Sequence, residues 1–304
     1  MPDTMTQDDW TDGLHEGIPA EEYHDLDRCS NSRLSLLQRS PAHAKEAMDH
    51  PKPTTKAQRI GTATHTAILE PDLLDDTVAV AGQCAGITNS GSRCSRTGKV
   101  RRAGDWYCGT HDPGEEEAGP VYDGIVVSKE QRERITGMVE AVCAHPAAWD
   151  LLASGDSEMT ALFDHSHINK ETGEVYDLPC KARIDHITES TDALVDLKTT
   201  RDASKESFQK DVWRNGYFRQ LAFYRYALVE CAHGLVDTYI VAVEKKPPHA
   251  VAVYQLTETT LKAGWRQLED LLARYVQCER AAYWPAYPEG AQELELPHWA
   301  WDKL

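Results

Sequence analysis

Residues 192–203 read "DALVDLKTTRDA", and this stretch decides how the chain is expected to fold. Its apolar run predicts a buried strand that ends in Asp196 and Lys198. Residues two apart in a strand point to the same face, so a carboxylate and an ammonium group are expected side by side. Asp185 ends a second apolar run, "CKARID", eleven residues earlier. If these strands pair through the turn "TESTD", the two carboxylates approach each other on the sheet.

Two acids and one lysine in this arrangement suit the hydrolysis of phosphodiester bonds. The carboxylates of Asp185 and Asp196 can hold Mg²⁺ or Mn²⁺, which polarises a phosphate and lowers the pKa of a bound water. Lys198 can then orient that water or help to deprotonate it. The alternative is a surface ion pair between Asp196 and Lys198 at a strand end, worth about 0–1 kcal/mol. Spacing alone leaves both interpretations open.

The pattern of apolar residues predicts an α/β fold with a mixed sheet flanked by helices. A meander of three strands is followed by a helix, two more strands and a long helix. The expected strands cover residues 158–165, 178–187, 192–199, 236–246 and 249–256. A pair of helices is expected within residues 32–50, and a further helix over 53–71 with Thr54 or Thr55 as its cap. Another helix runs from Ser128 to about residue 142 and begins with a capping box of Ser128 and Gln131. The last two cover 207–232, with a break near Asn215-Gly216, and 258–279.

Charge is distributed unevenly along the 304 residues, whose formal net charge is −17. Residues 1–30 hold nine acidic side chains against the single Arg28, lack periodicity, and are expected to form a mobile or loosely docked acidic segment. Phosphate binding depends on Lys and Arg, so the net charge argues against a nucleic-acid partner. Residues 198–225, which include Arg201, nevertheless hold seven basic side chains against three acidic ones. Charges on solvated helix faces are the alternative explanation.

The chain lacks the features of a membrane or secreted protein. No apolar run approaches the roughly 20 residues that a membrane helix needs, and the start "MPDTMTQDDWTDG" does not have the regions of a signal peptide. A cytoplasmic protein without a membrane partner is therefore expected. The aromatic tail, residues 283–304, is expected to pack on the core, with packing on a neighbouring subunit as the alternative.

Several motifs together resemble a known nuclease family. Asp185 followed by ten residues and "DLKTT" resembles the core of the PD-(D/E)xK nuclease superfamily. "GTATHTAILEP", which contains His65, resembles the histidine helix of RecB-type and RecE (exonuclease VIII) nucleases, and "GYFRQLAFYRYAL" resembles their Q-x-x-x-Y helix with Gln220 and Tyr224. "SPAHAKEAM", "KARIDHI" and "DLKTTRDAS" are also similar to the phage-type RecE exonuclease domain, and the likeness runs from about residue 31 to 245.

The resemblance implies a restriction-endonuclease-like core in residues 31–304 and a metal-dependent exodeoxyribonuclease. Such an enzyme degrades double-stranded DNA from its ends, 5′ to 3′, and serves phage-type recombination beside a single-strand annealing protein. It also implies a phage or prophage origin, the host cytoplasm and a ring-like homo-oligomer. An endonuclease or a single-strand nuclease of the same superfamily is the alternative within this class.

The resemblance also assigns roles to individual residues. The ligands of Mg²⁺ or Mn²⁺ would be His65, Asp185 and Asp196, and the base would be Lys198. Glu158 is a candidate for holding a second metal or its water, and Gln220 and Tyr224 would support the ligands or contact DNA. Lys181 and Arg183 would contact phosphate or pair with the acids. The alternatives are a structural helix histidine for His65 and ordinary helix packing for Gln220 and Tyr224.

Residues 82–113 break the periodic pattern and predict an inserted zinc-binding loop. Cys84, Cys94, Cys108 and His111 supply three thiolates and one imidazole, which can close a tetrahedral Zn²⁺ site. The alternatives are reduced, unliganded cysteines or an iron–sulfur cluster, which normally uses four cysteines. The loop is also basic and is expected to contact DNA or a partner through Arg93, Arg96, Arg101 and Arg102. A non-catalytic zinc-containing DNA-binding or adaptor protein is the alternative from another functional class.

Overall fold

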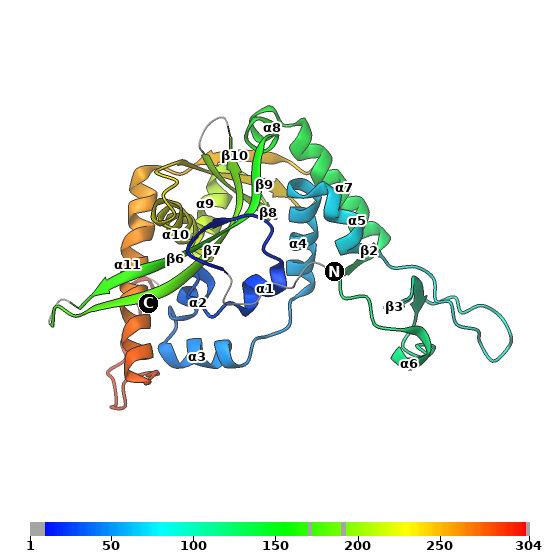
Figure 1. Ribbon diagram of the computed structural model, residues 1–304, viewed down its shortest axis with the longest axis horizontal. Coiled ribbons are helices and arrows are strands. Elements are labelled where there is room, and N and C mark those ends of the chain that lie inside the picture. The colour runs from blue at the N-terminus through cyan, green and yellow to red at the C-terminus, as the bar shows by residue number, and fades with distance from the viewer. Residues whose placement is uncertain (1–9, 170–171, 190–192, 302–304) are drawn as a thin grey trace.

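The strand that ends in Asp196 and Lys198 lies inside a six-stranded sheet in the computed structural model, which describes residues 10–169, 172–189 and 193–301 (Figure 1). The strand order is β1-β6-β7-β8-β9-β10, and all neighbours are antiparallel except the parallel pair β8 and β9. The predicted meander and mixed sheet are confirmed. The strands are β1 (Gly13–His15), β6 (Gly155–Ile168), β7 (Val175–Thr188), β8 (Ala193–Thr200), β9 (Asp237–Glu244) and β10 (Val251–Gln255).

Side-chain caps begin the helices where the sequence predicts them. Thr55 and Gln58 form one capping box, Ser128 and Gln131 form another, and Ser40 accepts a hydrogen bond from the His43 backbone. Among the described residues, no helix has the length and hydropathy needed to cross a membrane. The helices are α1 (Ala20–Asp25), α2 (Asn31–Leu36), α3 (Pro41–Asp49), α4 (Lys56–Leu69), η2 (Pro71–Leu73), α5 (Leu74–Thr77), α6 (Glu115–Ala118), α7 (Lys129–Ala144), α8 (Pro146–Leu152), α9 (Lys205–Asn215), α10 (Tyr217–Glu230), α11 (Glu258–Ala281) and α12 (His298–Trp301).

Both faces of the sheet are covered, because residues of β8 alternate between two apolar cores. Leu194 faces α2, α10 and α11, whereas Val195 and Leu197 face α4, α7 and α8. All three side chains are fully buried. Asp196 therefore lies in a strand whose apolar neighbours are buried on both sides, and its carboxylate is removed from solvent.

The predicted acidic segment is docked rather than loose over its described part, residues 10–29. β1 pairs with β6, and Ile18 and Leu26 are buried against Leu162. Lys181 lies beneath this segment: its Nζ donates to the backbone carbonyls of residues 23, 24 and 26, and the side chain is 3% exposed. The expectation that Lys181 contacts DNA phosphate is therefore wrong, because three backbone carbonyls already occupy its ammonium group. Residues 1–9 lie outside the described part.

The insert projects from the body beside α5 (Figure 1). Its base is the parallel pair β2 (Val78–Val80) and β5 (Ile125–Val127), and a small hairpin, β3 (Val100–Arg102) and β4 (Asp105–Tyr107), lies within it. The two ends of the insert thus meet in a short sheet, which allows the loop to be added without disturbing the central sheet.

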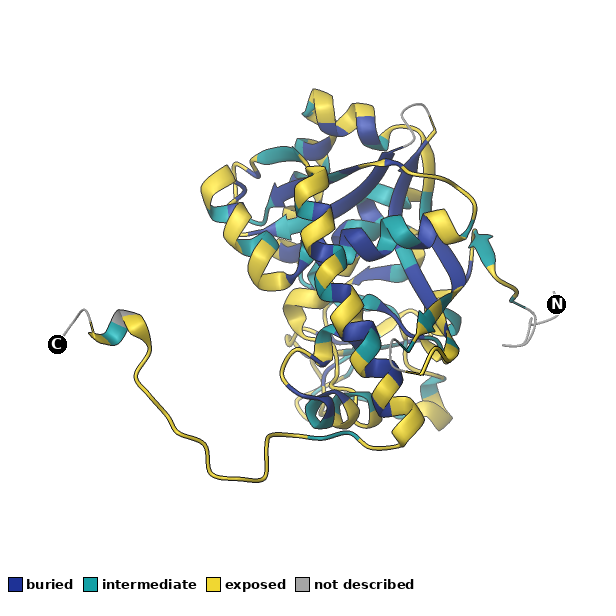
Figure 2. Ribbon diagram, turned by 90° about the vertical axis from the view of Figure 1, so that its left-hand side faces the viewer, coloured by how far each residue is buried: buried dark blue, intermediate teal, exposed yellow. Residues whose placement is uncertain are grey.

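The expectation that the aromatic tail packs on the core is only partly met. Trp284 packs edge-to-face on Tyr275, with ring centroids 5.6 Å apart. Pro285 accepts a hydrogen bond from the Ala42 backbone N–H, and the centre of the Tyr287 ring lies 5.8 Å from that of His43. Farther along, the chain runs away from the body (Figure 2), and Leu294 is 97% exposed.

Replacing Lys181 with Met is expected to lower the free energy of unfolding by about 1–3 kcal/mol, because three buried carbonyls lose their donor. Urea unfolding measures the loss, and limited proteolysis should show faster cleavage within residues 10–29. Lys52→Met, at an exposed position, is the matched control and should change stability by less than about 0.5 kcal/mol. Equal stability of the two variants would contradict the structural role of Lys181.

Candidate active site

Asp185 lies where β7 and β8 stop pairing. The two strands pair at His186 with Val195 and at Ile187 with Leu194, and within the described residues the pairing does not continue past Asp185. Instead, the Leu197 backbone N–H donates to Asp185 Oδ2 at 2.9 Å. The carboxylate thus takes the place of a backbone acceptor and opens a gap between the strands. Residues 190–192 of the predicted turn lie outside the described part.

Asp196 and Lys198 lie side by side, as their spacing predicts. Lys198 Nζ donates to Asp196 Oδ1 at 2.6 Å, and Asp196 is fully buried. Burial raises the pKa of Asp196 to about 7, Lys198 opposes this shift, and the charge of Asp185 adds to it. Burial alone would lower the pKa of Lys198, but the two carboxylates outweigh it and raise that pKa. Asp196 Oδ2 is buried and has no hydrogen-bond partner among the described residues, which is costly for a carboxylate unless a ligand binds there.

Glu158 lies opposite Asp185 on the neighbouring strand. β6 pairs with β7 in one register on both sides of this position, Ser157 with His186 and Met159 with Ile184, so no residue is inserted. Glu158 itself has φ +53°, which interrupts the ladder and costs a non-glycine residue about 1–2 kcal/mol. Burial and the charge of Asp185 raise the pKa of Glu158 to about 7. The strained backbone therefore turns a second carboxylate toward Asp185.

His65 reaches the same place from α4, on the side of the sheet where α4 packs. His65 Nδ1 lies 3.5 Å from Asp185 Oδ2. Burial lowers the pKa of His65, although Asp185 opposes this, so the neutral imidazole that a metal ion requires is favoured. Potential ligand atoms of His65, Glu158 and Asp185 lie within 4.8 Å of one another. One nitrogen and two carboxylates at these distances could hold a divalent cation.

The described geometry differs from the expected ligand set in one respect. His65 and Asp185 come together as expected, but the third member of the cluster within 4.8 Å is Glu158, whereas Asp196 is held by Lys198. From the sequence, Glu158 was expected only as a candidate for a second metal or its water. Its left-handed backbone conformation cannot be inferred from a run of residues that is typical of a strand. Asp196 remains a candidate ligand through its unpartnered Oδ2.

Arg183 is the second cation beside the acids. Its Nε donates to Glu158 Oε2 at 3.0 Å, and its Nη2 donates to the Ile18 carbonyl of the docked N-terminal segment at 2.7 Å. Arg183 was expected either to contact phosphate or to pair with the acids, and in the structure it pairs with an acid. The N-terminal segment thereby helps to hold Arg183 against Glu158.

One face of α10 borders the site. Gln220 Nε2 donates to Tyr224 Oη at 2.8 Å, and Lys198 Nζ lies 5.2 Å from the centre of the Tyr217 ring. Burial raises the pKa of Tyr224, and the charge of Asp185 contributes. Tyr217, Gln220 and Tyr224 are spaced three and four residues apart and share this face.

Two residues near the site were not expected from the sequence. Tyr217 could have been found from its helical spacing to Gln220, and Glu70 from its place directly after the His65 helix. Glu70 caps α4, and its negative charge contributes to the raised pKa of Glu158.

The insert gathers its three cysteines and one histidine in a separate cluster. Cys84, Cys94, Cys108 and His111 have potential ligand atoms within 4.8 Å of one another, and the three cysteines are buried. His111 Nδ1 lies 3.5 Å from Cys84 Sγ and 3.6 Å from Cys108 Sγ. A tetrahedral Zn²⁺ with bonds of about 2.3 Å to sulfur and about 2.0 Å to nitrogen needs S···N separations of about 3.5 Å. The ligand spacing therefore fits zinc.

Backbone donors favour the thiolate form of Cys108. The N–H groups of Thr110 and His111, with help from the other two cysteines, lower the pKa of Cys108 to about 6. Cys84 Sγ accepts hydrogen bonds from the N–H groups of Gly86 and Cys108. A Cβ on Gly86 would lie 2.4 Å from the His111 side chain, so this position requires glycine. Such N–H···S bonds commonly orient cysteine ligands around a metal.

The basic residues of the insert are not equally accessible. Arg102 is 8% exposed; it pairs with Asp112 at 2.8 Å and donates to the Gly119 carbonyl, so its expected DNA contact is wrong. Arg101 lies against the rings of Trp106 and Tyr122. Arg93 and Arg96 are exposed, although each donates one hydrogen bond within the insert.

The mixed sheet with two aspartates and a lysine at its splayed strands is that of the PD-(D/E)xK nuclease superfamily. A family model described as "PDDEXK-like domain of unknown function (DUF3799)" matches residues 126–297, which is more than half of the chain. The chain belongs to this family. The expected superfamily and fold class are confirmed.

Two solved structures are similar to the chain. A "Putative exonuclease" from Eubacterium rectale has a TM-score of 0.58 and 12% identity, and the alignment covers 95% of this chain and 98% of that one. This likeness extends over the whole fold. The structure of SSO0001 has a TM-score of 0.27 and 20% identity, covers 46% of this chain and 60% of its own, and supports no argument. No curated protein matches the sequence significantly.

The backbone at Glu158 can be tested with two substitutions that remove the same carboxylate. Glu158→Gly is expected to be about 1 kcal/mol more stable than Glu158→Ala, because only glycine adopts positive φ without a steric penalty. Urea unfolding in a chelating buffer measures the difference. A more stable alanine variant would mean that the backbone at this position is extended.

Proposed function

We propose that the chain is a divalent-metal-dependent deoxyribonuclease that hydrolyses double-stranded DNA from its ends. The PDDEXK-like family and the fold support a nuclease. The observation that carries the proposal is Asp196 Oδ2, a buried carboxylate oxygen that has no partner in the described part of the chain and lies beside a cluster of two more acids and a histidine. Like charges gathered at this cost are expected where a cation binds.

We further propose that His65, Asp185, Asp196 and Glu158 would hold Mg²⁺ or Mn²⁺. The donor set fits such ions, because three carboxylates supply hard oxygen ligands and burial keeps the imidazole neutral. A bound ion would polarise the scissile phosphate and lower the pKa of the attacking water.

Lys198 is the proposed base and orienting group for that water. Its Nζ is held at 2.6 Å from Asp196 and faces the Tyr217 ring, so its position is restricted. The neighbouring carboxylates favour the ammonium form by raising the pKa of Lys198. That preference weakens once their charge is compensated, so Lys198 would release a proton to solvent and, as the neutral amine, could accept one from the attacking water. Gln220 and Tyr224 then support the ligands or contact DNA.

The finer function rests on the motifs shared with RecE-type nucleases. These motifs favour 5′ to 3′ exonuclease action in phage-type recombination, beside a single-strand annealing protein, by a ring-like homo-oligomer in the host cytoplasm. The structural neighbour from Eubacterium rectale bears an exonuclease name, which agrees with this proposal. Arg201, Arg93, Arg96 and Arg101 are the proposed DNA contacts.

Asp196→Asn and Lys198→Met are expected to reduce cleavage of linear duplex DNA in Mg²⁺ by about 10²–10⁴-fold, because each removes a group that acts on the attacking water. A gel assay of product formation measures the rates. Closed circular DNA separates the two nuclease modes: an exonuclease leaves it intact, whereas an endonuclease cuts it.

The matched controls are Asp150→Asn and Lys52→Met at exposed positions, which should cut like the wild type. Circular dichroism checks that the site variants fold. Wild-type rates for either site variant would refute the proposed site. Metal-independent DNA binding without any product would instead favour the adaptor alternative.

The insert is proposed to be a structural zinc module. Cys108→Ser is expected to lower the zinc content by one site, because an alcohol is a poor replacement for a thiolate ligand. Inductively coupled plasma mass spectrometry measures the metal, and limited proteolysis should show cleavage within residues 82–113. Cys143→Ser, at an exposed cysteine elsewhere, is the control. Iron and a visible absorption band in the wild type would contradict zinc.

A further inference from the structure

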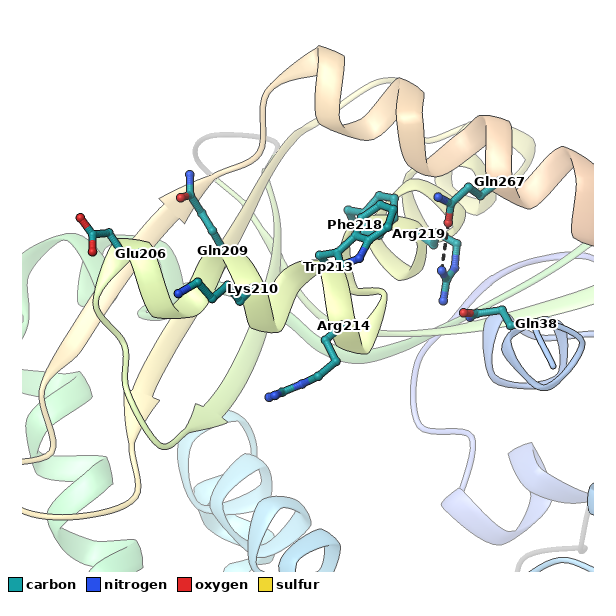
Figure 3. A pocket seen from close by; sticks show the side chains of 9 residues that line it. All are labelled: Gln38, Glu206, Gln209, Lys210, Trp213, Arg214, Phe218, Arg219 and Gln267. Atoms are coloured by element: carbon teal, nitrogen blue, oxygen red, sulfur yellow. Dashed lines mark hydrogen bonds between the residues drawn. The ribbon is translucent and has the colours of Figure 1, made fainter. Parts of the chain in front are cut away.

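A cavity lies at the junction of α9 and α10 (Figure 3). Its volume is about 880 Å³, and its lining includes Lys210, Trp213, Arg214, Phe218, Arg219 and Gln267. None of these residues belongs to the proposed metal site. The lining combines exposed aromatic surface with three basic groups and one acid, Glu206, in a chain whose net charge is −17.

Arg219 is a buried cation that pairs with no acid within residues 10–169, 172–189 and 193–301. It is 6% exposed, and its Nη1 donates to Gln267 Oε1 at 3.0 Å. The Gln38 amide, in the orientation that satisfies both groups, also accepts from its guanidinium. Arg219 Nε is buried without a hydrogen-bond partner, and among the described residues no carboxylate pairs with this arginine. Neutral amides do not compensate a buried charge, so the cavity favours an anion.

The backbone is shaped around this arginine. Gly216, between α9 and α10, has φ +71°, and a Cβ there would lie 2.2 Å from Arg219 Nη2. The turn therefore favours glycine for its left-handed conformation, and the absence of a Cβ leaves space for the guanidinium where it lies. Both Nη atoms already donate to Gln267 and Gln38, so Arg219 contributes its positive charge to the cavity rather than a bidentate contact.

An aromatic platform lies beside the cation. Trp213 stacks on Phe218 with ring centroids 5.5 Å apart and 14° between the planes, yet Trp213 is 68% exposed. Figure 3 shows this pair between Lys210 and Arg219. The Lys210 side chain forms no ion pair among the described residues, whereas Arg214 pairs with Asp211. An exposed indole next to unpaired cations is the arrangement on which nucleic-acid bases stack in single-strand binding proteins.

The cavity also adjoins the proposed active site through α10. Tyr217 faces Lys198, whereas the next two residues, Phe218 and Arg219, line the cavity. The end of β8 is tied to α9 by a hydrogen bond from Thr200 Oγ1 to Asp211 Oδ2. A strand that leaves the proposed site along α10 would meet this cavity directly.

We propose that the cavity binds a nucleotide of single-stranded DNA, with its base on Trp213 and its phosphate at Lys210, near the positive charge of Arg219. A base must leave its duplex stack before it can lie on an indole, so a single strand is the form of DNA that fits. This inference rests on the proposed nuclease function, because action of a nuclease on duplex DNA would supply the single strand. It does not depend on the metal ligands, so binding can be tested without cleavage.

The test is fluorescence anisotropy of a labelled oligothymidylate of about 12 nucleotides, measured with full-length protein in a buffer without chelator and without added Mg²⁺ or Mn²⁺. Trp213→Ala is expected to weaken binding by about 5- to 150-fold, because it removes the stacking surface. Arg219→Gln and Lys210→Gln should each weaken binding and reduce the salt dependence, by about 0.7 in the slope of log K against log salt. Trp149→Ala, at a tryptophan on α8 that is 51% exposed, is the matched control.

The outcomes separate this inference from the nuclease proposal. If Trp213→Ala and Lys210→Gln, both at exposed positions, bind the oligonucleotide like the wild type, the inference is overturned whatever the cleavage assay shows. Equal competition by thymidine monophosphate would also overturn it, since a free nucleotide would then be the ligand. An equal loss of affinity for blunt duplex would assign the cavity to double-stranded DNA instead. Loss confined to the single strand supports the proposal even if Asp196→Asn retains cleavage.

Discussion

The structure depends on holding three carboxylates together against their mutual repulsion. Asp185, Asp196 and Glu158 come from three neighbouring strands and are largely removed from water, so burial and like charge raise the pKa of Glu158 and Asp196 to about 7. Lys198 and Arg183 compensate only part of this charge, and Asp196 Oδ2 keeps no partner among the described residues. The interrupted pairing of β7 with its neighbours and the positive φ of Glu158 follow from this requirement. A divalent cation would lower the energy of the whole cluster, which is why its geometry supports a metal-dependent function.

The N-terminal segment, although acidic, is part of this arrangement. Its backbone carbonyls accept from Lys181, and the Ile18 carbonyl accepts from Arg183, which in turn binds Glu158. Carbonyl dipoles thus hold two cations of β7 without placing a further carboxylate beside the site. The acidic side chains of this segment can point to solvent while its backbone supports the site, so its composition says little about its role.

Two sides of helix α10 border two different sites. Tyr217, Gln220 and Tyr224 border the acids, whereas Phe218 and Arg219 line a cavity with Trp213 of α9. Gly216 makes this division possible, because its left-handed conformation lets the helix restart in a new direction and leaves room for the Arg219 guanidinium. The locally basic stretch within residues 198–225 thereby forms surface on which DNA can be held by a chain whose net charge is −17.

The sequence by itself determined the order of the elements, the caps at Thr55 and Ser128, the break at Gly216 and the adjacency of Asp196 and Lys198, because each depends on neighbours within a few residues. It also identified the family and the cysteine cluster, since motif spacing carries that information. Only the tertiary structure decided that Glu158 joins His65 and Asp185, that Lys181 and Arg102 are occupied, and that the N-terminal segment is docked. The position of Glu158 depends on a left-handed backbone conformation within a strand. The partners of Lys181 and Arg102 depend on which carbonyl or carboxylate, distant in the sequence, lies next to each cation. Local propensity and hydrophobic periodicity do not encode either property.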